Sequence, residues 1–200
     1  MIIALTGRRG CGKSTAAAYL VKEHGFELRG FADPLKRSFA ALFNIPYHSI
    51  EKWKNDPDMF ASLQTHTELV ADMSFREALQ RYGTEAHRDI FGEDFWVDQT
   101  LPLPPVGFYA GRKIVIHDCR FINEAYRVKQ LSGLTIGITR ATNIKTLHRV
   151  PEESHVSETE MDDIPKDYVI KNDGTVRELH QSIESLLSAI DNIPRYERIS

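Results

Sequence analysis

Apolar runs and amphipathic stretches alternate along the first 45 residues of the chain. The run at 1–7 predicts a buried strand that ends in glycine, and the helix-forming stretch at 13–25 ends in another glycine. A second short strand is predicted at 26–31. The stretch 33–44 has apolar residues at helical spacing, with Asp33 as the expected N-cap and a proline at the first helical position. The N-terminal part is therefore predicted to form strand, helix, strand and helix.

The pattern changes between about residues 46 and 110. No clean alternation of period two occurs there, whereas the segments 74–83 and 92–101 have patterns compatible with helices. We expect an all-helical insertion over this part of the chain.

The alternation of strands and helices resumes after the insertion. The predicted elements are strands at 112–118, 134–140 and 167–172 and helices at 123–133 and 174–190. The polar and poorly periodic segment at 141–160 is predicted to be a lid. Together the elements predict one α/β domain over 1–200, a doubly wound sheet of about five parallel strands with its core at 1–45 and 111–190. A ligand is expected at the carboxyl ends of the strands.

The composition is that of a soluble globular protein. Of the 200 residues, 42% are hydrophobic and 26% are charged, and the net charge of -3 argues against a nucleic-acid-binding surface. No apolar run approaches the roughly 18 residues of a transmembrane helix, and the chain opens with strand-like sequence instead of a signal peptide. We therefore expect a cytoplasmic protein with neither nucleic acid nor membrane as a partner. Cys11 and Cys119 are expected to be free thiols.

The segment GRRGCGKST joins the first predicted strand to the first predicted helix. Its residues from Gly7 to Ser14 follow the phosphate-binding pattern G-x-x-x-x-G-K-S. Glycines allow backbone N–H groups to converge on phosphate oxygens, and the helix N-terminus adds partial positive charge. In this pattern Lys13 reaches the β- and γ-phosphates, and Ser14 holds Mg²⁺. The loop therefore predicts that the protein binds a nucleotide.

Asp118 ends the predicted strand at 112–118, at the edge of the sheet where Mg²⁺ bound by Ser14 would lie. We interpret it as a Walker-B carboxylate, and a helix-capping aspartate is the alternative. Arg120 follows two residues later and is a candidate for bringing positive charge to the phosphates.

Two other classes of nucleotide-binding protein fit the sequence less well. The residues at 89–92 match the D-x-x-G pattern of GTPases, but they follow helix-like sequence, and no N-K-x-D element for guanine recognition appears later. A motor or helicase needs further modules and usually a longer chain. A small phosphotransferase is the better interpretation.

A kinase needs cations outside the phosphate loop to hold its second substrate. Arg76 and Gln80 are four residues apart and share one helix face, Thr84 continues along it, and Arg88 follows in the same insertion. An arginine beside a glutamine can clamp a phosphate and read a base edge. A solvated surface role is the alternative for each of these residues.

The segment after the fourth predicted strand also carries cations. Arg140, His148 and Arg149 are candidates for a closing lid that stabilises charge on the transferring phosphoryl group. An ordinary solvated loop is the alternative.

Six blocks of the sequence resemble the phage-type deoxynucleoside monophosphate kinases in their order and approximate spacing. They are GRRGCGKST, FADPLK, LQRYGTEAHRDIFGEDFWV, DCRFINEA, HVSE and VIKNDGT. The resemblance covers roughly residues 1–190 and implies an adenylate-kinase-like P-loop fold whose helical insertion binds the acceptor. It implies ATP and Mg²⁺ as donor and cofactor and a deoxynucleoside monophosphate as acceptor. It also implies a location in the host cytoplasm for a phage-encoded protein, and a homodimer stays open.

The same resemblance implies roles for individual residues. ATP would be bound by Gly10, Cys11, Gly12, Lys13, Ser14 and Thr15. The acceptor would be bound by Asp33, Lys36, Arg76, Gln80, Thr84, Arg88, Trp96, His148 and Glu158. The catalytic residues would be Lys13, Asp118, Arg120, Arg140 and Arg149, with Ser14 and Asp118 holding Mg²⁺ partly through water.

Some of these roles, and the function itself, have alternatives. A core position is the commoner role for a tryptophan such as Trp96, whereas Asp33 can cap its helix and Lys36 can face solvent. One rival function is a kinase of the same architecture that acts on another metabolite, such as dephospho-coenzyme A. The other is a nucleotide-dependent binding or sensor protein without turnover.

Overall fold

The chain folds into two compact units. A computed structural model describes residues 1–54, 73–103, 105, 108–141 and 161–192. Unit 1 comprises Met1–Gly30 and Leu103–Ser200, and unit 2 comprises Phe31–Pro102. Within the described ranges, no helix combines the length and the apolar character that crossing a membrane requires.

Unit 1 is built on a five-stranded sheet. Its strands are β1 (Ile2–Thr6), β2 (Glu27–Arg29), β3 (Ile114–Ile116), β4 (Leu134–Thr139) and β5 (Tyr168–Lys171). They lie in the order β2-β3-β1-β4-β5, and every pairing is parallel. The predicted doubly wound parallel sheet is therefore confirmed.

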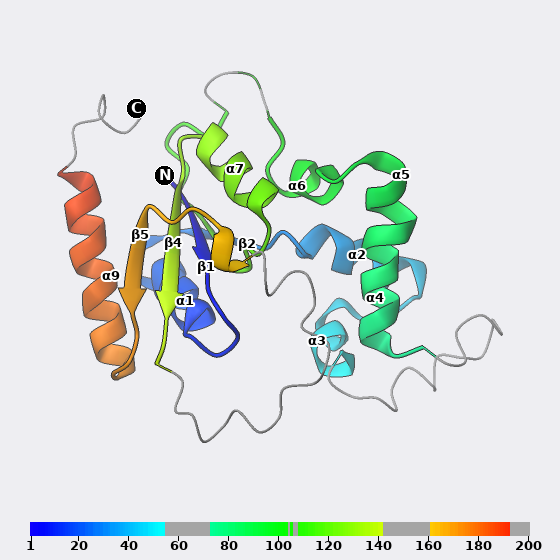
Figure 1. The fold of residues 1–200 in the computed structure, drawn as a ribbon, viewed down its shortest axis with the longest axis horizontal. Coiled ribbons are helices and arrows are strands. Elements are labelled where there is room, and N and C mark those ends of the chain that lie inside the picture. Colours follow the sequence, from blue (N-terminus) through cyan, green and yellow to red (C-terminus); the bar gives the residue numbers. More distant parts are fainter. Residues whose placement is uncertain (55–72, 104, 106–107, 142–160, 193–200) are drawn as a thin grey trace. The chain divides into compact units, whose positions relative to one another are not determined.

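Helices cover both faces of this sheet (Figure 1). They are α1 (Lys13–His24), α7 (Ile122–Gln130) and α9 (Val176–Asp191). Because side chains alternate along a strand, Ile3 and Leu5 of β1 join the buried core formed with α1 and α9. Ile2 points to the other face, where it lies beside Val128 of α7 next to Gly133. The sheet is thus buried on both sides, which explains why its strands are short continuous apolar runs.

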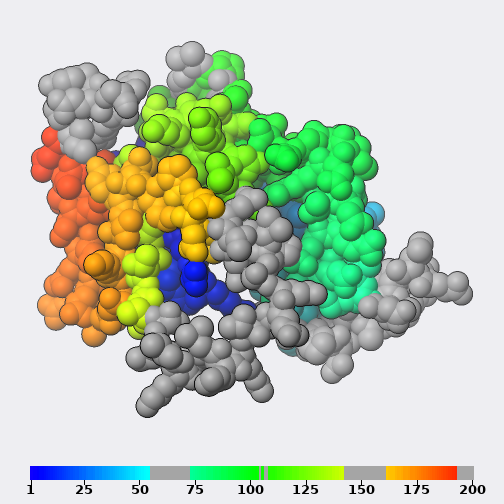
Figure 2. Space-filling view, viewed as in Figure 1, coloured from blue at the N-terminus to red at the C-terminus, as the bar shows by residue number. Residues whose placement is uncertain are grey.

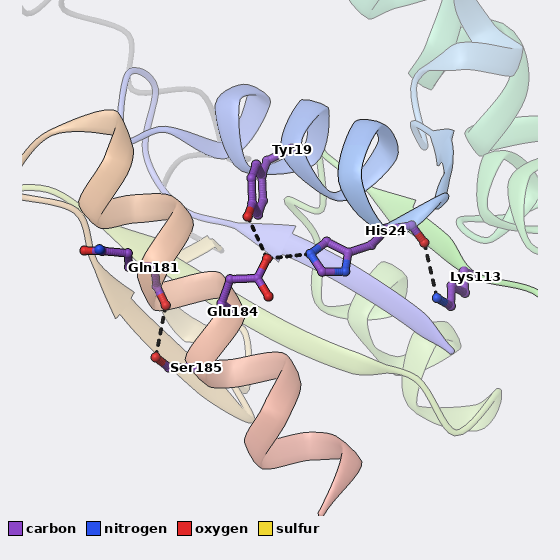
Figure 3. A network of polar contacts seen from close by, with 6 residues as sticks. All are labelled: Tyr19, His24, Lys113, Gln181, Glu184 and Ser185. Atoms are coloured by element: carbon purple, nitrogen blue, oxygen red, sulfur yellow. Dashed lines mark hydrogen bonds and ion pairs between the residues drawn. The ribbon is translucent and has the colours of Figure 1, made fainter.

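The helices α1 and α9 are also joined by polar contacts (Figure 3). The Tyr19 hydroxyl donates a hydrogen bond to Glu184 Oε1 at 2.6 Å, and His24 Nε2 lies 2.7 Å from the same oxygen. The Tyr19 ring stacks on His180, with 3.9 Å between the ring centroids. One carboxylate of α9 therefore holds two side chains of α1.

Within the described residues of unit 2, all the regular elements are helical. Its elements are α2 (Asp33–Leu42), η1 (Tyr47–Ser49), α3 (Ile50–Trp53), α4 (Phe75–Gly83), the π-helical turn η4 (Thr84–Arg88), α5 (Asp89–Phe91) and α6 (Phe95–Thr100). Phe39 of α2, Ile50 of α3, and Phe75 and Leu79 of α4 form its buried core. The rings of Phe39 and Phe75 meet edge to face.

Two details of the second helix differ from the sequence prediction. The N-cap of α2 is Ala32, and Asp33 is the first helical residue, so the predicted N-cap was wrong by one position. The Asp33 carboxylate instead accepts a hydrogen bond from Tyr47 at 3.1 Å. The helix also belongs to the core of unit 2, because Phe39 packs there, so this unit begins at Phe31 instead of near residue 46.

Candidate nucleotide-binding site

The loop at 7–12 connects β1, the central strand, to the N-terminus of α1. Gly7, Gly10 and Gly12 all have positive φ angles, of 138°, 81° and 111°. A side chain at Gly7 would overlap the Ile138 carbonyl oxygen, and one at Gly12 would overlap Nδ2 of Asn172. Gly10 is exposed and has open space where a Cβ would lie. The loop therefore needs glycine both for its backbone conformation and for its close packing against β4 and the end of β5.

Lys13 is the first residue of α1, and its side chain turns back over the loop. Its ammonium group donates hydrogen bonds to the carbonyl oxygens of Gly7 and Arg8, the latter at 3.0 Å. Burial lowers the pKa of Lys13; the Cys11 thiol and the Asp118 carboxylate raise it, and the Arg120 charge lowers it further. The structure therefore brings Lys13 into the electrostatic neighbourhood of both predicted reaction-centre residues, Asp118 and Arg120.

Asp118 and Arg120 lie in the loop that leaves the carboxyl end of β3. The strand ends at Ile116, so Asp118 is two residues beyond it instead of at its last position. Asp118 is partly buried and Arg120 is exposed. Asp118 is not the N-cap of α7, because that position is Phe121.

A buried glutamate fixes the backbone of this loop. Oε2 of Glu124, whose residue is 3% exposed, accepts hydrogen bonds from the backbone N–H of Arg120 at 2.7 Å and of Phe121 at 3.1 Å. Burial raises the pKa of the neighbouring Cys119 thiol well above its ordinary value, and the charges of Glu124 and Asp118 add to that. Both cysteines, Cys11 and Cys119, are free thiols as predicted.

The first turn of α1 presents two hydroxyl groups. Ser14 and Thr15 are exposed, at the N-terminus of a 12-residue helix. Ser14 and the Asp118 carboxylate are oxygen donors of the kind that Mg²⁺ prefers. Among the described residues, no three His, Cys, Asp or Glu side chains cluster closely enough to bind a metal by themselves. Two oxygen donors are compatible with the usual mode of Mg²⁺ binding, in which one or two protein groups and substrate phosphates hold the ion.

Arg8 of the loop forms an exposed ion pair with Asp162, with 2.8 Å between Nη2 and Oδ2. In the space-filling view, part of the N-terminal segment, in blue, reaches the surface next to the orange-yellow segment that follows residue 160 (Figure 2). An exposed pair of this kind contributes little to stability.

Arg140 is exposed and directly follows β4. It therefore lies at the same edge of the sheet as the phosphate loop, because the carboxyl ends of parallel strands share an edge. His148, Arg149 and Glu158, and the predicted lid at 141–160 apart from Ala141, lie outside the described residues.

The remaining predicted acceptor residues belong to unit 2. Arg76 is exposed on α4, Gln80 is partly buried one turn later, and Thr84 and Arg88 are the first and last residues of the π-helical turn. Short π-helical segments are rare and are often found at functional sites. The structure therefore brings four predicted acceptor residues onto one continuous helical segment.

Two other predicted acceptor residues, Trp96 and Lys36, are held by contacts within unit 2. Trp96 is 4% exposed, and its indole N–H donates to the Gly83 carbonyl oxygen at 2.9 Å, so the core alternative describes its position. Lys36 forms an ion pair of 2.6 Å with Glu51, and its side chain is only 13% exposed, so it does not simply face solvent.

The sequence analysis missed three features of the site. Glu124 holds the loop after β3, and Asn172 contacts the phosphate loop from a position far along the chain. The hydroxyl of Thr6, at the end of β1, is a buried side-chain group without a hydrogen-bond partner within the described part of the protein. For Glu124, its place three residues after Phe121 at a helix start was an available signal.

A glycine-rich loop between the central strand of a parallel sheet and a helix that begins with lysine defines a P-loop nucleotide-binding protein. The sequence model of the deoxynucleotide monophosphate kinase family matches residues 47–183. A protein of Acanthamoeba polyphaga mimivirus that is assigned as a deoxynucleotide monophosphate kinase is 31% identical over 201 residues, which cover 96% of this chain and 97% of the viral one. The chain belongs to the deoxynucleotide monophosphate kinase family, and it is a phosphotransferase. The resemblance seen in the sequence is confirmed.

Solved structures of other kinases align along nearly the whole chain. Shikimate kinase from Aquifex aeolicus is 13% identical, with coverage of 96% of this chain and 98% of that chain and a TM-score of 0.45. Dephospho-CoA kinase from Campylobacter jejuni is 15% identical, with coverage of 94% and 96% and a TM-score of 0.48. Likenesses this distant carry no argument about the substrate of this chain, and the dephospho-coenzyme A alternative gains no support from them.

Proposed function

We propose that the protein transfers the γ-phosphoryl group of ATP, in the presence of Mg²⁺, to a deoxynucleoside monophosphate and so forms the diphosphate. The observation that carries this proposal is the phosphate loop, with Lys13 at its end and the charges of Asp118 and Arg120 acting on the Lys13 ammonium. The family membership supports the choice of acceptor.

The donor nucleotide would be held by the loop and by the first turn of α1. Gly10, Cys11, Gly12, Ser14 and Thr15 would surround the phosphates with backbone N–H groups and hydroxyls, as the positive φ of the glycines supports. Lys13 would exchange its hydrogen bonds to the Gly7 and Arg8 carbonyls for bonds to phosphate oxygens. This exchange replaces two neutral acceptors by charged ones, which make stronger hydrogen bonds.

Ser14, and Asp118 partly through water, would hold Mg²⁺, which when bound neutralises charge on the phosphate oxygens. Both residues are oxygen donors of unit 1, and both stand at the edge of the sheet where the loop lies. Asp118 is therefore expected to matter through its charge and not through its size.

The acceptor monophosphate would be held by Arg76, Gln80, Thr84 and Arg88. Their position on α4 and the π-helical turn supports a shared role. Because the indole N–H of Trp96 is bonded to Gly83, we propose that Trp96 supports this turn from the core instead of stacking on a base.

Asp33, Lys36, His148 and Glu158 complete the proposed acceptor set. Asp33 and Lys36 both lie in the first turn of α2, where their charges would stand near the acceptor phosphate. Both side chains also have structural partners, Tyr47 and Glu51. Substrate kinetics are therefore needed to separate a role in acceptor binding from a structural role.

In the reaction, an ionised oxygen of the acceptor phosphate attacks the γ-phosphorus of ATP, and the bond from that phosphorus to the β,γ-bridging oxygen breaks. The products are ADP and a deoxynucleoside diphosphate. No general base is required, because the attacking oxygen carries no proton at neutral pH. Lys13, Arg120, Arg140 and Arg149 would stabilise the charge that spreads over the transferring group.

The proposed partners are small molecules only, with neither nucleic acid nor a membrane, and a homodimer stays open. The test of this function is ADP release measured with ATP, Mg²⁺ and a panel of deoxynucleoside monophosphates. Acceptor-dependent ADP release supports a kinase. ATP binding without any acceptor-stimulated release would instead indicate a sensor.

A further inference from the structure

The residue after β5, Asn172, touches the phosphate loop although 161 positions separate the two along the chain. Asn172 is 7% exposed, and its Nδ2 donates a hydrogen bond to the Cys11 carbonyl oxygen at 2.8 Å. The same Nδ2 group occupies the space that a Cβ at Gly12 would need. A buried amide therefore contacts two successive residues of the loop.

The hydrogen bond from Asn172 fixes the orientation of the peptide group between Cys11 and Gly12. The peptide that joins Cys11 to Gly12 is planar and trans, so its C=O and N–H groups point in opposite directions. Because Asn172 holds the Cys11 carbonyl, the N–H of Gly12 must point away from Asn172. That N–H is one of the backbone donors that a phosphate loop offers to its ligand.

Asn172 is itself held in place by the sheet. Its backbone N–H donates to the Thr139 carbonyl oxygen at 2.7 Å, where β4 ends beside β5. The next residue, Asp173, accepts a hydrogen bond from the backbone N–H of Ala141 at 2.5 Å. The backbone of Asn172 is therefore fixed by hydrogen bonds at the ends of two paired strands, whereas the loop that its amide contacts is rich in glycine.

We propose that Asn172 is a positioning residue for ATP: its side-chain amide holds the phosphate loop in the conformation that presents the Gly12 N–H to the ligand. This inference rests on the proposed function, in which the loop binds the ATP phosphates. Without the amide, the Cys11 carbonyl is buried without its donor, and the Cys11–Gly12 peptide is free to rotate. ATP binding then has to order the loop, which costs affinity.

The test uses two substitutions of similar size and one matched control. Asn172→Leu removes the donor, and Asn172→Asp keeps the shape but replaces the donor with an acceptor. Thr135→Val is the control, because Thr135 is also a buried polar residue of this sheet, 4% exposed, but lies near the amino end of β4. ATP affinity is measured by calorimetry without any acceptor, and thermal unfolding is followed in parallel.

Both Asn172 variants are expected to bind ATP about tenfold more weakly, the effect of roughly one lost hydrogen bond to a buried carbonyl. In turnover assays the KM for ATP should rise by a similar factor, and the KM for the acceptor should stay within about twofold of the wild-type value. Thr135→Val should leave ATP affinity unchanged.

The proposal is overturned if both Asn172 variants bind ATP within about twofold of the wild type, or if Thr135→Val weakens ATP binding as much as they do. It is also overturned if neither Asn172 variant folds while the control does, because the residue is then needed for folding itself. A wild-type protein that binds ATP but phosphorylates no deoxynucleoside monophosphate would contradict the proposed function and leave the comparison of ATP affinities intact.

Discussion

Replacing Glu124 by glutamine should lower both stability and turnover, because this buried carboxylate binds the backbone N–H of Arg120. In the wild type, one carboxylate oxygen accepts the N–H groups of Arg120 and Phe121, at 2.7 and 3.1 Å. The Phe121 N–H belongs to the N-cap of α7, where a helix has donors without intrahelical partners, and the Arg120 N–H lies one residue before it. Glutamine keeps the shape and one neutral acceptor but removes the negative charge.

The size of the effect follows from these two hydrogen bonds. A hydrogen bond to a charged group contributes about 1.5–3 kcal/mol, roughly twice the value of a neutral one. Weakening two such bonds without losing either should therefore cost about 1–2 kcal/mol, together with the favourable interaction of the charge with the helix N-terminus. For a chain of this length, that loss lowers the melting temperature by about 2–8 °C. If Arg120 acts on the transferring group as proposed, turnover should fall about tenfold, because its backbone is held less firmly.

Glu178 provides a matched control. It occupies the same third position of α9 and accepts hydrogen bonds from the Thr175 N–H and hydroxyl, at 2.7 and 2.8 Å. Glu178→Gln should reduce stability slightly and leave kcat unchanged. Circular-dichroism melts and coupled ADP-release assays measure both quantities. Wild-type turnover in Glu124→Gln, or an equal loss of turnover in Glu178→Gln, would contradict this role of Glu124.

Three further changes concern Lys13, Gly12 and Glu184. Lys13→Ala should reduce kcat by at least about 100-fold with the fold intact, and near-normal ADP release would contradict the proposed role of its ammonium group. Gly12→Ala should weaken ATP binding as well as stability, because the φ of Gly12 is 111° and the added methyl group overlaps Asn172. Gly25→Ala should reduce stability only, because Gly25 has a φ of 69° but open space around it. Equal ATP affinity in the two variants would contradict this expectation. Hydrogen bonds from Tyr19 and His24 lower the pKa of Glu184 below its ordinary value of 4.5, so the stability that Glu184 contributes is present above that value and lost as the pH falls through the lower, folded-state pKa. The stabilities of wild type and Glu184→Gln should therefore differ at pH 7 and converge once the pH has fallen through that lowered pKa. A difference that persists in strong acid would contradict the assignment (Figure 3).

Much of unit 1 was predictable because its signals are local. The apolar runs at 1–7 and 134–140 are short and continuous, as strands buried on both faces must be, and Gly25 ends α1 with the positive φ that favours glycine there. The phosphate loop was predictable for the same reason, since strand, glycine pattern and helix are contiguous in the sequence.

Other features depend on contacts between distant residues, and periodicity carries no information about them. The spacing of apolar residues in α2 predicts a buried helix face but does not say against which elements that face packs, so its place in unit 2 became visible only from the contact of Phe39 with Phe75. The π-helical turn at Thr84–Arg88 likewise follows a helix without any change of residue pattern.

Asn172 illustrates the same limit within the site. The segment VIKNDGT was part of the family resemblance, but nothing in its composition indicates that the asparagine amide reaches Cys11. The contact requires β5 to lie beside β4, which in turn lies beside β1, and that order is a property of the folded sheet. A local motif can therefore predict the phosphate loop but not the residue that holds it.

The most direct test of the central claim is acceptor-dependent turnover. ADP production should be measured with ATP, Mg²⁺ and each of the four common deoxynucleoside monophosphates and their ribose counterparts, with identification of the diphosphate product. At least one deoxynucleoside monophosphate should stimulate ADP release well above the rate with ATP alone and be converted to its diphosphate in equal amount. Stimulation by none of the eight acceptors, from a folded protein that binds ATP, would contradict the proposed function.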